Sequence, residues 1–224
     1  MKKIGMLTIG QSPREDIVSV MRRYLPQEVE ILQRGALDDL DLSRMAELQP
    51  QAGQPALVTR MRDGTGVQLN REKILPLMQK EIHALVKEGV ELVTLLCTGD
   101  FPELATGRMI LHPGRLLHNV IMALAKGIRL GIVMPSASQI PLAQEEWKAL
   151  DVAITSASPY TEPETRAKAW NRAAEELKEK KVDLVYLDCM GMDEKMKKIV
   201  HQVTLKPVIL ASSLVARIID ELMG

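Results

Sequence analysis

The chain has 224 residues, of which 46% are hydrophobic and 26% are charged, and its 29 basic residues balance 29 acidic ones. A net charge of zero argues against binding of nucleic acid or anionic lipid through bulk electrostatics, and an aromatic content of 3% is low for a base-stacking platform. The apolar runs are too short to span a bilayer, and the N-terminus has no signal-peptide cleavage site. Two cysteines are too few for a disulfide scaffold. Together these features predict a cytoplasmic α/β protein that acts on a small molecule.

Short runs of valine, isoleucine and leucine alternate with longer amphipathic stretches, which is typical of βαβ units in a largely parallel sheet. Ser12 before Pro13 predicts the N-cap of the first helix, and Asp63-Gly64 predicts the turn of a β-hairpin. In chain order we expect a strand over 4–9, a helix over 13–24, a strand over 29–33, hairpin strands over 56–61 and 66–69, a helix over 71–87, a strand over 92–96, a helix over 115–126, a strand over 130–134, a helix over 139–150, a strand over 152–155, a helix over 164–180, a strand over 184–187, a helix over 194–203, a strand over 208–210 and a helix over 214–223.

An internal repeat is the most informative feature of the sequence. Residues 90–99, VELVTLLCTG, align with residues 182–191, VDLVYLDCMG, at six identical positions. Two further matches pair 109–111 with 208–210 and 4–7 with 130–133. The repeat predicts two pseudo-symmetric parallel-sheet lobes with helices on both faces and a ligand cleft between the lobes.

The repeat also predicts the boundaries of the lobes. We expect a first lobe over 1–112 plus 212–224 and a second lobe over 113–211, so that the last helix returns to pack on the first lobe. The first lobe holds the extra residues, and a hairpin at about 56–70 is their natural location. We expect this hairpin to border the cleft.

Cys97 and Cys189 end matched strands of the repeat, and each is followed closely by glycine. The carboxyl ends of parallel strands are where α/β sheets bind ligands. Backbone amides in the turns Thr98-Gly99 and Met190-Gly191 are positioned to donate to an anion, and they are expected to lower the pKa of at least one thiol. If the lobes face each other, one thiolate removes a proton from a bound molecule and the opposed thiol returns one to its other face.

Two other interpretations of the cysteines stay open. Free cysteine is among the most buried residue types, so each thiol is also compatible with a plain core position. A redox pair is the other option, although cytosolic disulfides are usually transient. We favour the acid-base pair because both cysteines occupy one position of the repeat. Its thiols should then lie on the order of 7 Å apart in a closed form, because each must approach one carbon to about 3–3.5 Å.

Four motifs, spread over essentially the whole chain, resemble those of the AroM family. They are Ile9-Gly10-Gln11-Ser12-Pro13-Arg14, Arg60-Met61-Arg62-Asp63-Gly64, Leu96-Cys97-Thr98-Gly99 and Leu187-Asp188-Cys189-Met190-Gly191. The two-lobe pattern is in turn similar to the aspartate/glutamate/hydantoin racemase superfamily. That resemblance implies a racemase-like α/β fold and a cofactor-free site with Cys97 and Cys189 as the acid/base cysteines.

The residues after the cysteines differ from the pattern of those racemases, which usually have Asn-Thr after the first and Thr after the second. Isomerisation, decarboxylation or carbon–carbon cleavage of another small carboxylate is therefore as well supported as amino-acid racemisation. The leading hypothesis is a cofactor-independent isomerase or lyase. The alternative is a protein of the same fold that binds a small carboxylate or aromatic-pathway metabolite without chemistry.

Further candidates for substrate binding lie in loops at the same sheet ends. Gln11, Ser12 and Arg14 follow the first strand in an anion-binding position, and Ser12 is equally compatible with a plain N-cap. Ser136 and Ser138 occupy the equivalent loop of the second lobe. The complete set of candidates for substrate binding is Gln11, Ser12, Arg14, Arg60, Arg62, Thr98, Gly99, Ser136, Ser138, Met190 and Gly191.

The arginines of the hairpin, Arg60 and Arg62, share one strand face and are positioned to lean over the cleft toward a carboxylate, the alternative being a solvated edge. His112 and His118 gather with Arg115 near the crossover between the lobes, but a spacing of six does not make a one-turn metal pair. We expect no metal, no cofactor, no nucleic acid and no membrane partner. Self-association into a homo-oligomer stays open.

Overall fold

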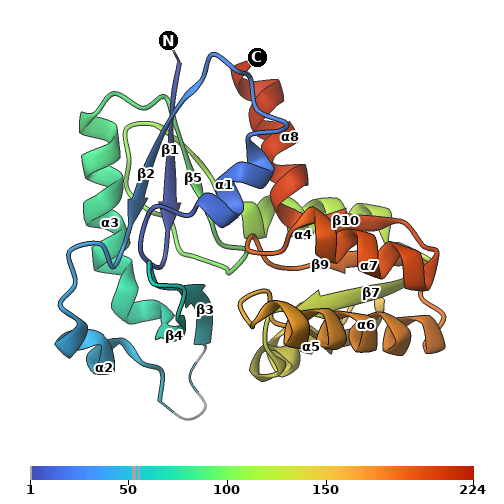
Figure 1. Cartoon of the computed structure of the whole chain (residues 1–224). Coiled ribbons are helices and arrows are strands. Elements are labelled where there is room, and N and C mark those ends of the chain that lie inside the picture. Colours follow the sequence, from blue (N-terminus) through green and yellow to red (C-terminus); the bar gives the residue numbers. More distant parts are fainter. Residues whose placement is uncertain (1, 52–53, 55) are drawn as a thin grey trace.

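The structure is a computed structural model that describes residues 2–51, 54 and 56–224 (Figure 1). Its strands form two four-stranded parallel sheets and one separate antiparallel hairpin. The first sheet runs in the order β2 (Glu30–Gly35), β1 (Lys3–Thr8), β5 (Leu92–Leu95) and β6 (Met109–Leu111). The second runs in the order β8 (Asp151–Ser156), β7 (Arg129–Met134), β9 (Leu184–Leu187) and β10 (Val208–Leu210). The hairpin consists of β3 (Ala56–Arg60) and β4 (Gly66–Asn70).

The helices cover both faces of both sheets. They are α1 (Glu15–Met21), α2 (Met45–Leu48), α3 (Arg71–Lys87), α4 (Pro113–Leu124), α5 (Ile140–Glu146), α6 (Pro163–Glu179), α7 (Glu194–Thr204) and α8 (Ala211–Met223), with 3-10 turns at Leu42–Arg44 and Ala137–Gln139. The fold class expected from the sequence is confirmed, because the two sheets repeat one strand order and the strands leading to the two cysteines lie in different sheets.

Alternating side chains of the central strands divide the interior into three cores. On the first sheet, Leu7 and Val93 pack with α3, whereas Ile4 and Met6 face α1, α4 and α8. On the second sheet, Val133 packs with α6 and α7, whereas its other face packs with α5. The core that contains Ile4 also contains residues from the second sheet, so it is shared by both.

Matched glycines explain the third sequence match of the repeat. A Cβ on Gly5 of β1 would lie 2.9 Å from the side chain of Leu85 on α3, and a Cβ on Gly131 of β7 would lie 3.2 Å from Leu177 on α6. Each sheet therefore has a glycine in its first strand where a long helix approaches the backbone closely. The repeat in the sequence corresponds to a repeat in helix–strand packing.

Three expectations about elements need correction. The first helix begins at Glu15, and Ser12 is not its N-cap, because the Ser12 hydroxyl donates to Asp38. The helix expected over 139–150 is a 3-10 turn followed by α5, which ends at Glu146. Residues 109–111, noted only as a match to 208–210, form an edge strand of the first sheet.

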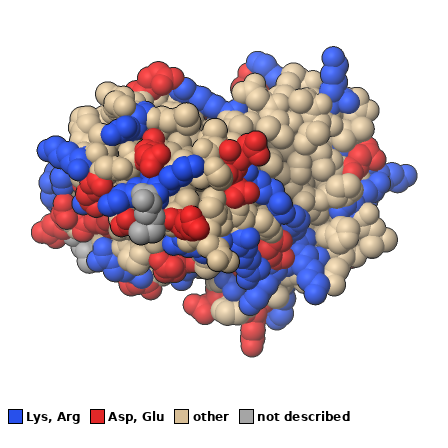
Figure 2. All heavy atoms as spheres, turned by 90° about the horizontal axis from the view of Figure 1, so that it is seen from above, with Lys and Arg blue, Asp and Glu red and all other residues tan. Residues whose placement is uncertain are grey.

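The last helix, α8, packs against α1 and α4 beside the first sheet (Figure 1). The residue boundaries of the lobes, 1–112 plus 212–224 and 113–211, stay a prediction. On the face seen in Figure 2, basic and acidic side chains are interspersed over much of the surface, beside a broad uncharged area. Among the helices of the described residues, none combines the length and the apolar character needed to cross a bilayer.

Candidate functional site

A cavity of about 550 Å³ lies where the carboxyl ends of the two sheets meet the hairpin. The turn after β5 lines it from the first sheet, and the residues after β7 and β9 line it from the second. Apolar side chains such as Leu57 of β3 and Leu142 of α5 contribute to its wall together with buried ionisable groups. The position is the one at which parallel α/β sheets bind ligands.

Cys97 and Cys189 both line this cavity, and both carry free thiols. Each follows its strand through the same backbone step, because Leu96 N–H donates to Leu7 O at 2.7 Å and Asp188 N–H donates to Val133 O at 3.0 Å. Each thiol then accepts one backbone N–H from the glycine two residues later, at 3.4 Å from Sγ in both cases. The cysteines thus occupy equivalent positions at the ends of equivalent strands. Their separation, expected on the order of 7 Å in a closed form, stays a prediction.

The protonation of the two thiols differs from the expectation. Burial raises the pKa of Cys97 to about 12, and the Gly99 N–H opposes that rise only in part. Burial also raises the pKa of Cys189, against the Gly191 N–H, the Tyr160 hydroxyl and the charge of Arg14. The expectation of a lowered thiol pKa is wrong for this structure, because the loss of hydration outweighs the amide hydrogen bonds. Both thiols are therefore protonated at neutral pH.

Arg14 reaches the cavity from the loop before α1, with only 3% of its surface exposed. Its guanidinium donates to both carboxylate oxygens of Asp16, at 2.9 and 2.8 Å, and to the hydroxyl of Tyr160 at 3.2 Å. The other terminal nitrogen faces the hydroxyls of Thr8 and Thr59, each at 3.4 Å. Arg14 is therefore a buried cation that is already paired, and its Tyr160 contact joins the loops of the two sheets.

Asp188 is an ionisable group in the cavity wall that sequence reasoning missed. Burial, together with the nearby Glu146 carboxyl, raises the pKa of Asp188 to about 7, although hydrogen bonds from Thr98 and Tyr186 oppose this rise. The Tyr186 hydroxyl donates to Asp188 Oδ1 at 3.0 Å. Beside them, His118 lies 3.4 Å from Glu146. At neutral pH this wall holds a carboxyl group able to donate or accept a proton.

The mismatch inside the repeat was the one signal that pointed to Asp188. Its equivalent in the first lobe is Leu96, so a buried carboxyl group replaces an apolar side chain at otherwise matched strand ends. Tyr160 and Gln139 line the cavity as well and were not singled out. Neither residue lies in one of the motifs. Tyr160 contacts Arg14 and Gln139 contacts Ala56, so both contacts depend on how the two halves of the molecule dock.

Some of the expected substrate-binding residues lie at the cavity. Arg14, Thr98, Gly99 and Met190 line it, and Gly191 contributes the N–H that binds Cys189. The hairpin borders the cavity as expected, through its first strand over Ala56–Thr59.

The remaining expected residues make contacts outside the cavity. Arg60 donates to Gly64 O at 3.0 Å within the hairpin, and Arg62 donates to Ser12 O at 2.8 Å. Asp38 binds the hydroxyl of Ser12 at 2.6 Å, and Gln11 donates to Leu37 O at 3.3 Å.

The serines of the equivalent second-lobe loop also lie outside the cavity. Ser136 and Ser138 bond to each other at 2.9 Å in an exposed turn. Residues of both β–α loops therefore hold the loops in shape, and the arginines of the hairpin do not lean over the cavity.

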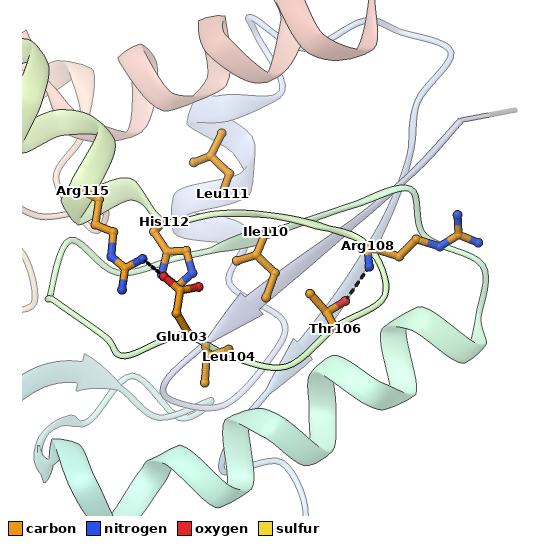
Figure 3. Close-up of a pocket in the computed structure, with 8 residues that line it drawn as sticks. All are labelled: Glu103, Leu104, Thr106, Arg108, Ile110, Leu111, His112 and Arg115. Carbon is orange, nitrogen blue, oxygen red and sulfur yellow. Dashed lines mark hydrogen bonds and ion pairs between the residues drawn. The ribbon is translucent and has the colours of Figure 1, made fainter.

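A second cavity, of about 540 Å³, is lined by the segment that joins β5 to β6, by β6 and by the start of α4 (Figure 3). His112 lines this hollow, so it does not share the first cavity with His118. Arg115 borders both cavities and pairs with Glu103, as the dashed line in Figure 3 indicates. Across the described residues, no three histidine, cysteine, aspartate or glutamate side chains are grouped to hold a metal ion.

Solved structures with the same fold include racemases and an isomerase. An aspartate racemase of Picrophilus torridus aligns over 99% of this chain and 94% of its own, with 12% identity and a TM-score of 0.58. The glutamate racemase isoform RacE1 of Bacillus anthracis aligns over 99% and 81%, with 15% identity and a TM-score of 0.61. The maleate isomerase Iso of Pseudomonas putida S16 aligns over 96% and 89%, with 14% identity and a TM-score of 0.59.

These identities are low, so the likeness establishes a racemase-type fold and nothing finer. Comparison with curated protein sequences gives no match. The family model described as AroM protein matches residues 4–223, which is nearly the whole chain. The sequence motifs, the two matched sheets and this match agree, and the chain belongs to the AroM family.

Proposed function

We propose that this protein is a cofactor-independent isomerase or lyase that acts on a small carboxylate, with Cys97 and Cys189 as its paired acid and base. One observation carries the proposal: the two cysteines stand at equivalent strand ends and line one cavity, each with an N–H donor on its sulfur. That N–H stabilises a thiolate once the thiol has ionised. The paired arrangement suits a reaction in which a proton leaves one face of a carbon and another enters the opposite face.

In the isomerase form of the proposal, the Cys189 thiolate removes the proton next to the substrate carboxylate. The electrons of the broken C–H bond stay on carbon and are delocalised into the carboxylate, while Cys189 becomes a neutral thiol. Cys97 then gives its proton to the opposite face and becomes the thiolate, and proton exchange with water restores the starting state. In the lyase form, written for a decarboxylation, the C–C bond to a second carboxylate breaks instead. Carbon dioxide leaves, the bonding electrons stay on the remaining carbon, and Cys97 gives its proton to that carbon, so only the proton donor is needed.

The proposal is tested by deuterium uptake from D₂O at the carbon next to the carboxylate, across a panel of amino, hydroxy and dicarboxylic acids. We expect uptake with at least one acid, slower uptake in Cys97→Ser and in Cys189→Ser, and no uptake when both cysteines are replaced. Ser136→Ala is the matched control, because that hydroxyl lies in the second lobe outside the cavity. Uptake that survives replacement of both cysteines, or that is unchanged in each single variant, contradicts the two-thiol chemistry.

The paired thiols also predict a protection experiment. Iodoacetamide modification of each cysteine, followed by peptide mass spectrometry, gives two rates in one sample. An acid that occupies the cavity should slow both rates together, because both thiols line it. If both cysteines react only after unfolding, they are core residues and the proposal fails.

A second candidate function is binding of a small carboxylate without chemistry. The specific observation in its favour is that burial raises both thiol pKa values, which leaves two neutral thiols at neutral pH. Thermal stabilisation by acids that show no deuterium uptake is the outcome that favours this candidate.

A further inference from the structure

The Tyr160 hydroxyl lies between a buried arginine of one sheet and a cysteine of the other. It is 3.2 Å from Arg14 Nη2 and 3.9 Å from Cys189 Sγ. Arg14 precedes α1 beside the first sheet, whereas Tyr160 lies between β8 and α6 and Cys189 follows β9 in the second. Three segments far apart in the sequence thus meet at one hydroxyl.

The chemistry of these groups fixes the direction of the Arg14 hydrogen bond, and it fixes that of the Cys189 contact once Cys189 is a thiolate. A guanidinium has five N–H donors and no acceptor, so the Tyr160 oxygen accepts from Arg14. Burial raises the pKa of Tyr160 well above its ordinary value, so the phenol keeps its proton. A thiolate has no proton to donate, so in the contact with an ionised Cys189 the Tyr160 O–H is the donor. A thiolate at Cys189 therefore gains an O–H donor polarised by a cation.

The second thiol has a different environment. Within the described residues, Cys97 Sγ has one hydrogen-bond donor, the Gly99 N–H. Cys189 Sγ has the matching Gly191 N–H and the Tyr160 hydroxyl in addition. The two strand ends are alike in backbone, so Tyr160 is the contact that distinguishes the thiols.

We infer that Tyr160 is a positioning residue that makes Cys189, rather than Cys97, the first thiol to ionise, and that its contact with Arg14 couples this preference to the docking of the two sheets. The assignment of base and acid that follows, Cys189 and Cys97, rests on the proposed function. The charged and titratable groups facing this sulfur are Arg14 beside the first sheet, Tyr160 and Asp188 beside the second, and Cys97 in the same cavity, while Asp16 pairs with Arg14.

The test follows the iodoacetamide reaction of both cysteines in one sample from pH 7 to pH 11. In the unmodified chain we expect Cys189 to react at lower pH than Cys97. In Tyr160→Phe, the Cys189 reaction should need higher pH and slow about tenfold at pH 8–9, the loss typical of a charge-assisted hydrogen bond, while Cys97 keeps its profile. A role in packing alone would expose both thiols and quicken both reactions.

Two more variants complete the test. Tyr24→Phe is the matched control, because its hydroxyl donates to Glu194 at 2.9 Å and not to a thiol; it should leave the Cys189 profile unchanged. In Gly191→Ala, the new Cβ would lie 2.2 Å from the Tyr160 oxygen and so must displace it, while the backbone N–H to Cys189 is kept. This variant should reproduce the Tyr160→Phe shift, and it decides the matter if Tyr160→Phe does not fold.

The inference is overturned if Cys97 reacts at the same or lower pH than Cys189, if neither reacts in the folded protein, or if both Tyr160→Phe and Gly191→Ala leave the ratio of the two rates unchanged. The proposed function fails on a different measurement, the absence of thiol-dependent deuterium uptake. If Cys189 reacts at lower pH than Cys97 but no acid shows deuterium uptake, the inference stands and the proposed function fails. If uptake is seen but Cys97 reacts at lower pH than Cys189, the proposed function stands and the inference fails.

Discussion

Asp188 and Cys189 are consecutive residues, and the carboxyl group stands in the same cavity wall as the thiol. Its pKa, raised to about 7 mainly by burial, makes Asp188 a group in the cavity that changes charge near neutral pH. A negative charge on Asp188 opposes ionisation of Cys97 and Cys189 alike. As the pH rises and Asp188 ionises, its negative charge therefore makes a thiolate harder to form at either cysteine.

Substitution of Asp188 by Asn should change how stability depends on pH. An unfolded aspartate ionises near pH 3.8, whereas this one stays protonated in the folded state until about pH 7. The folded state therefore binds more protons in that window, and the unmodified chain loses stability as the pH rises from about 4 to about 7. Asp188→Asn removes this loss, so its stability relative to the unmodified chain should increase through the window, by at most on the order of 4 kcal/mol, and stay constant above it.

Urea unfolding at half-unit pH steps measures this effect. Glu91→Gln is the control, because it neutralises an exposed carboxylate just before β5. A stability difference between Asp188→Asn and the unmodified chain that stays flat from pH 4 to pH 7 would contradict a raised pKa.

The sequence was informative about single residues where a side chain acts close to its own position. Cys97 and Cys189 were found because the repeat marks both strand ends, and Arg14 was found because it follows a strand. Tyr160 was not found, since its contact with Arg14 spans 146 residues and depends on how the sheets dock. Ser12 was expected to cap the first helix, whereas its hydroxyl donates to Asp38, a partner 26 residues away that local sequence does not reveal.

At the scale of elements, the start of α4 holds the turn that carries Cys97. A Cβ on Gly114 would lie 2.5 Å from Thr98 O and 2.9 Å from Gly99 O. These neighbours are backbone atoms, which cannot move aside as a flexible side chain does. The close approach fixes the turn after β5 against the helix and so positions one wall of the cavity.

Gly114→Ala should destabilise the fold and loosen this turn. We expect the free energy of unfolding in urea to fall by about 1–3 kcal/mol, the usual cost of overpacking. Relative to the unmodified chain, the rate of iodoacetamide modification should rise more at Cys97 than at Cys189. Gly107→Ala is the matched control, because a Cβ there has no heavy atom within 4 Å among the described residues. Equal stability of the two alanine variants would show that the turn and α4 are not tightly held.

Elements were predicted well where their ends are defined locally. The helix α3 was placed at both ends, since Asn70 caps it by accepting from Lys73 N–H at 3.2 Å. Prediction was poorer where tertiary contacts decide the ends. The first helix starts late because the Ser12 hydroxyl donates to Asp38. The helix α5 ends early at Glu146, and the next residue, Trp147, is buried against Tyr186.

For the whole molecule, the shared core is the feature that determines stability. Ile121 of α4 belongs to a cluster that includes Met6 of the first sheet and Ile132 of the second. A core shared in this way makes the two sheets depend on each other. We therefore expect them to unfold as one cooperative unit.

Ile121→Ala should lower the stability of both sheets by about 2–5 kcal/mol. The measurement is hydrogen exchange of the backbone amides of β1 and β7, which should lose the same protection free energy. Leu124→Ala, on the same helix with 53% of its surface exposed, is the control and should cost under about 1 kcal/mol. Loss of protection in only one sheet would show that the lobes are separate folding units.

The unlike neighbours of the two sulfurs have a stereochemical consequence. A carbanion next to a carboxylate is flat and presents two faces, and equivalent donors on both sides would protonate either face. In the lyase form of the proposal no proton is removed, so Cys189 stays a thiolate beside the Tyr160 hydroxyl, and the neutral thiol that supplies the proton faces the molecule from the Cys97 side. A substrate whose flat intermediate is prochiral would then give a single mirror-image product, with a handedness set by which of two matched strand ends has a phenol beside it.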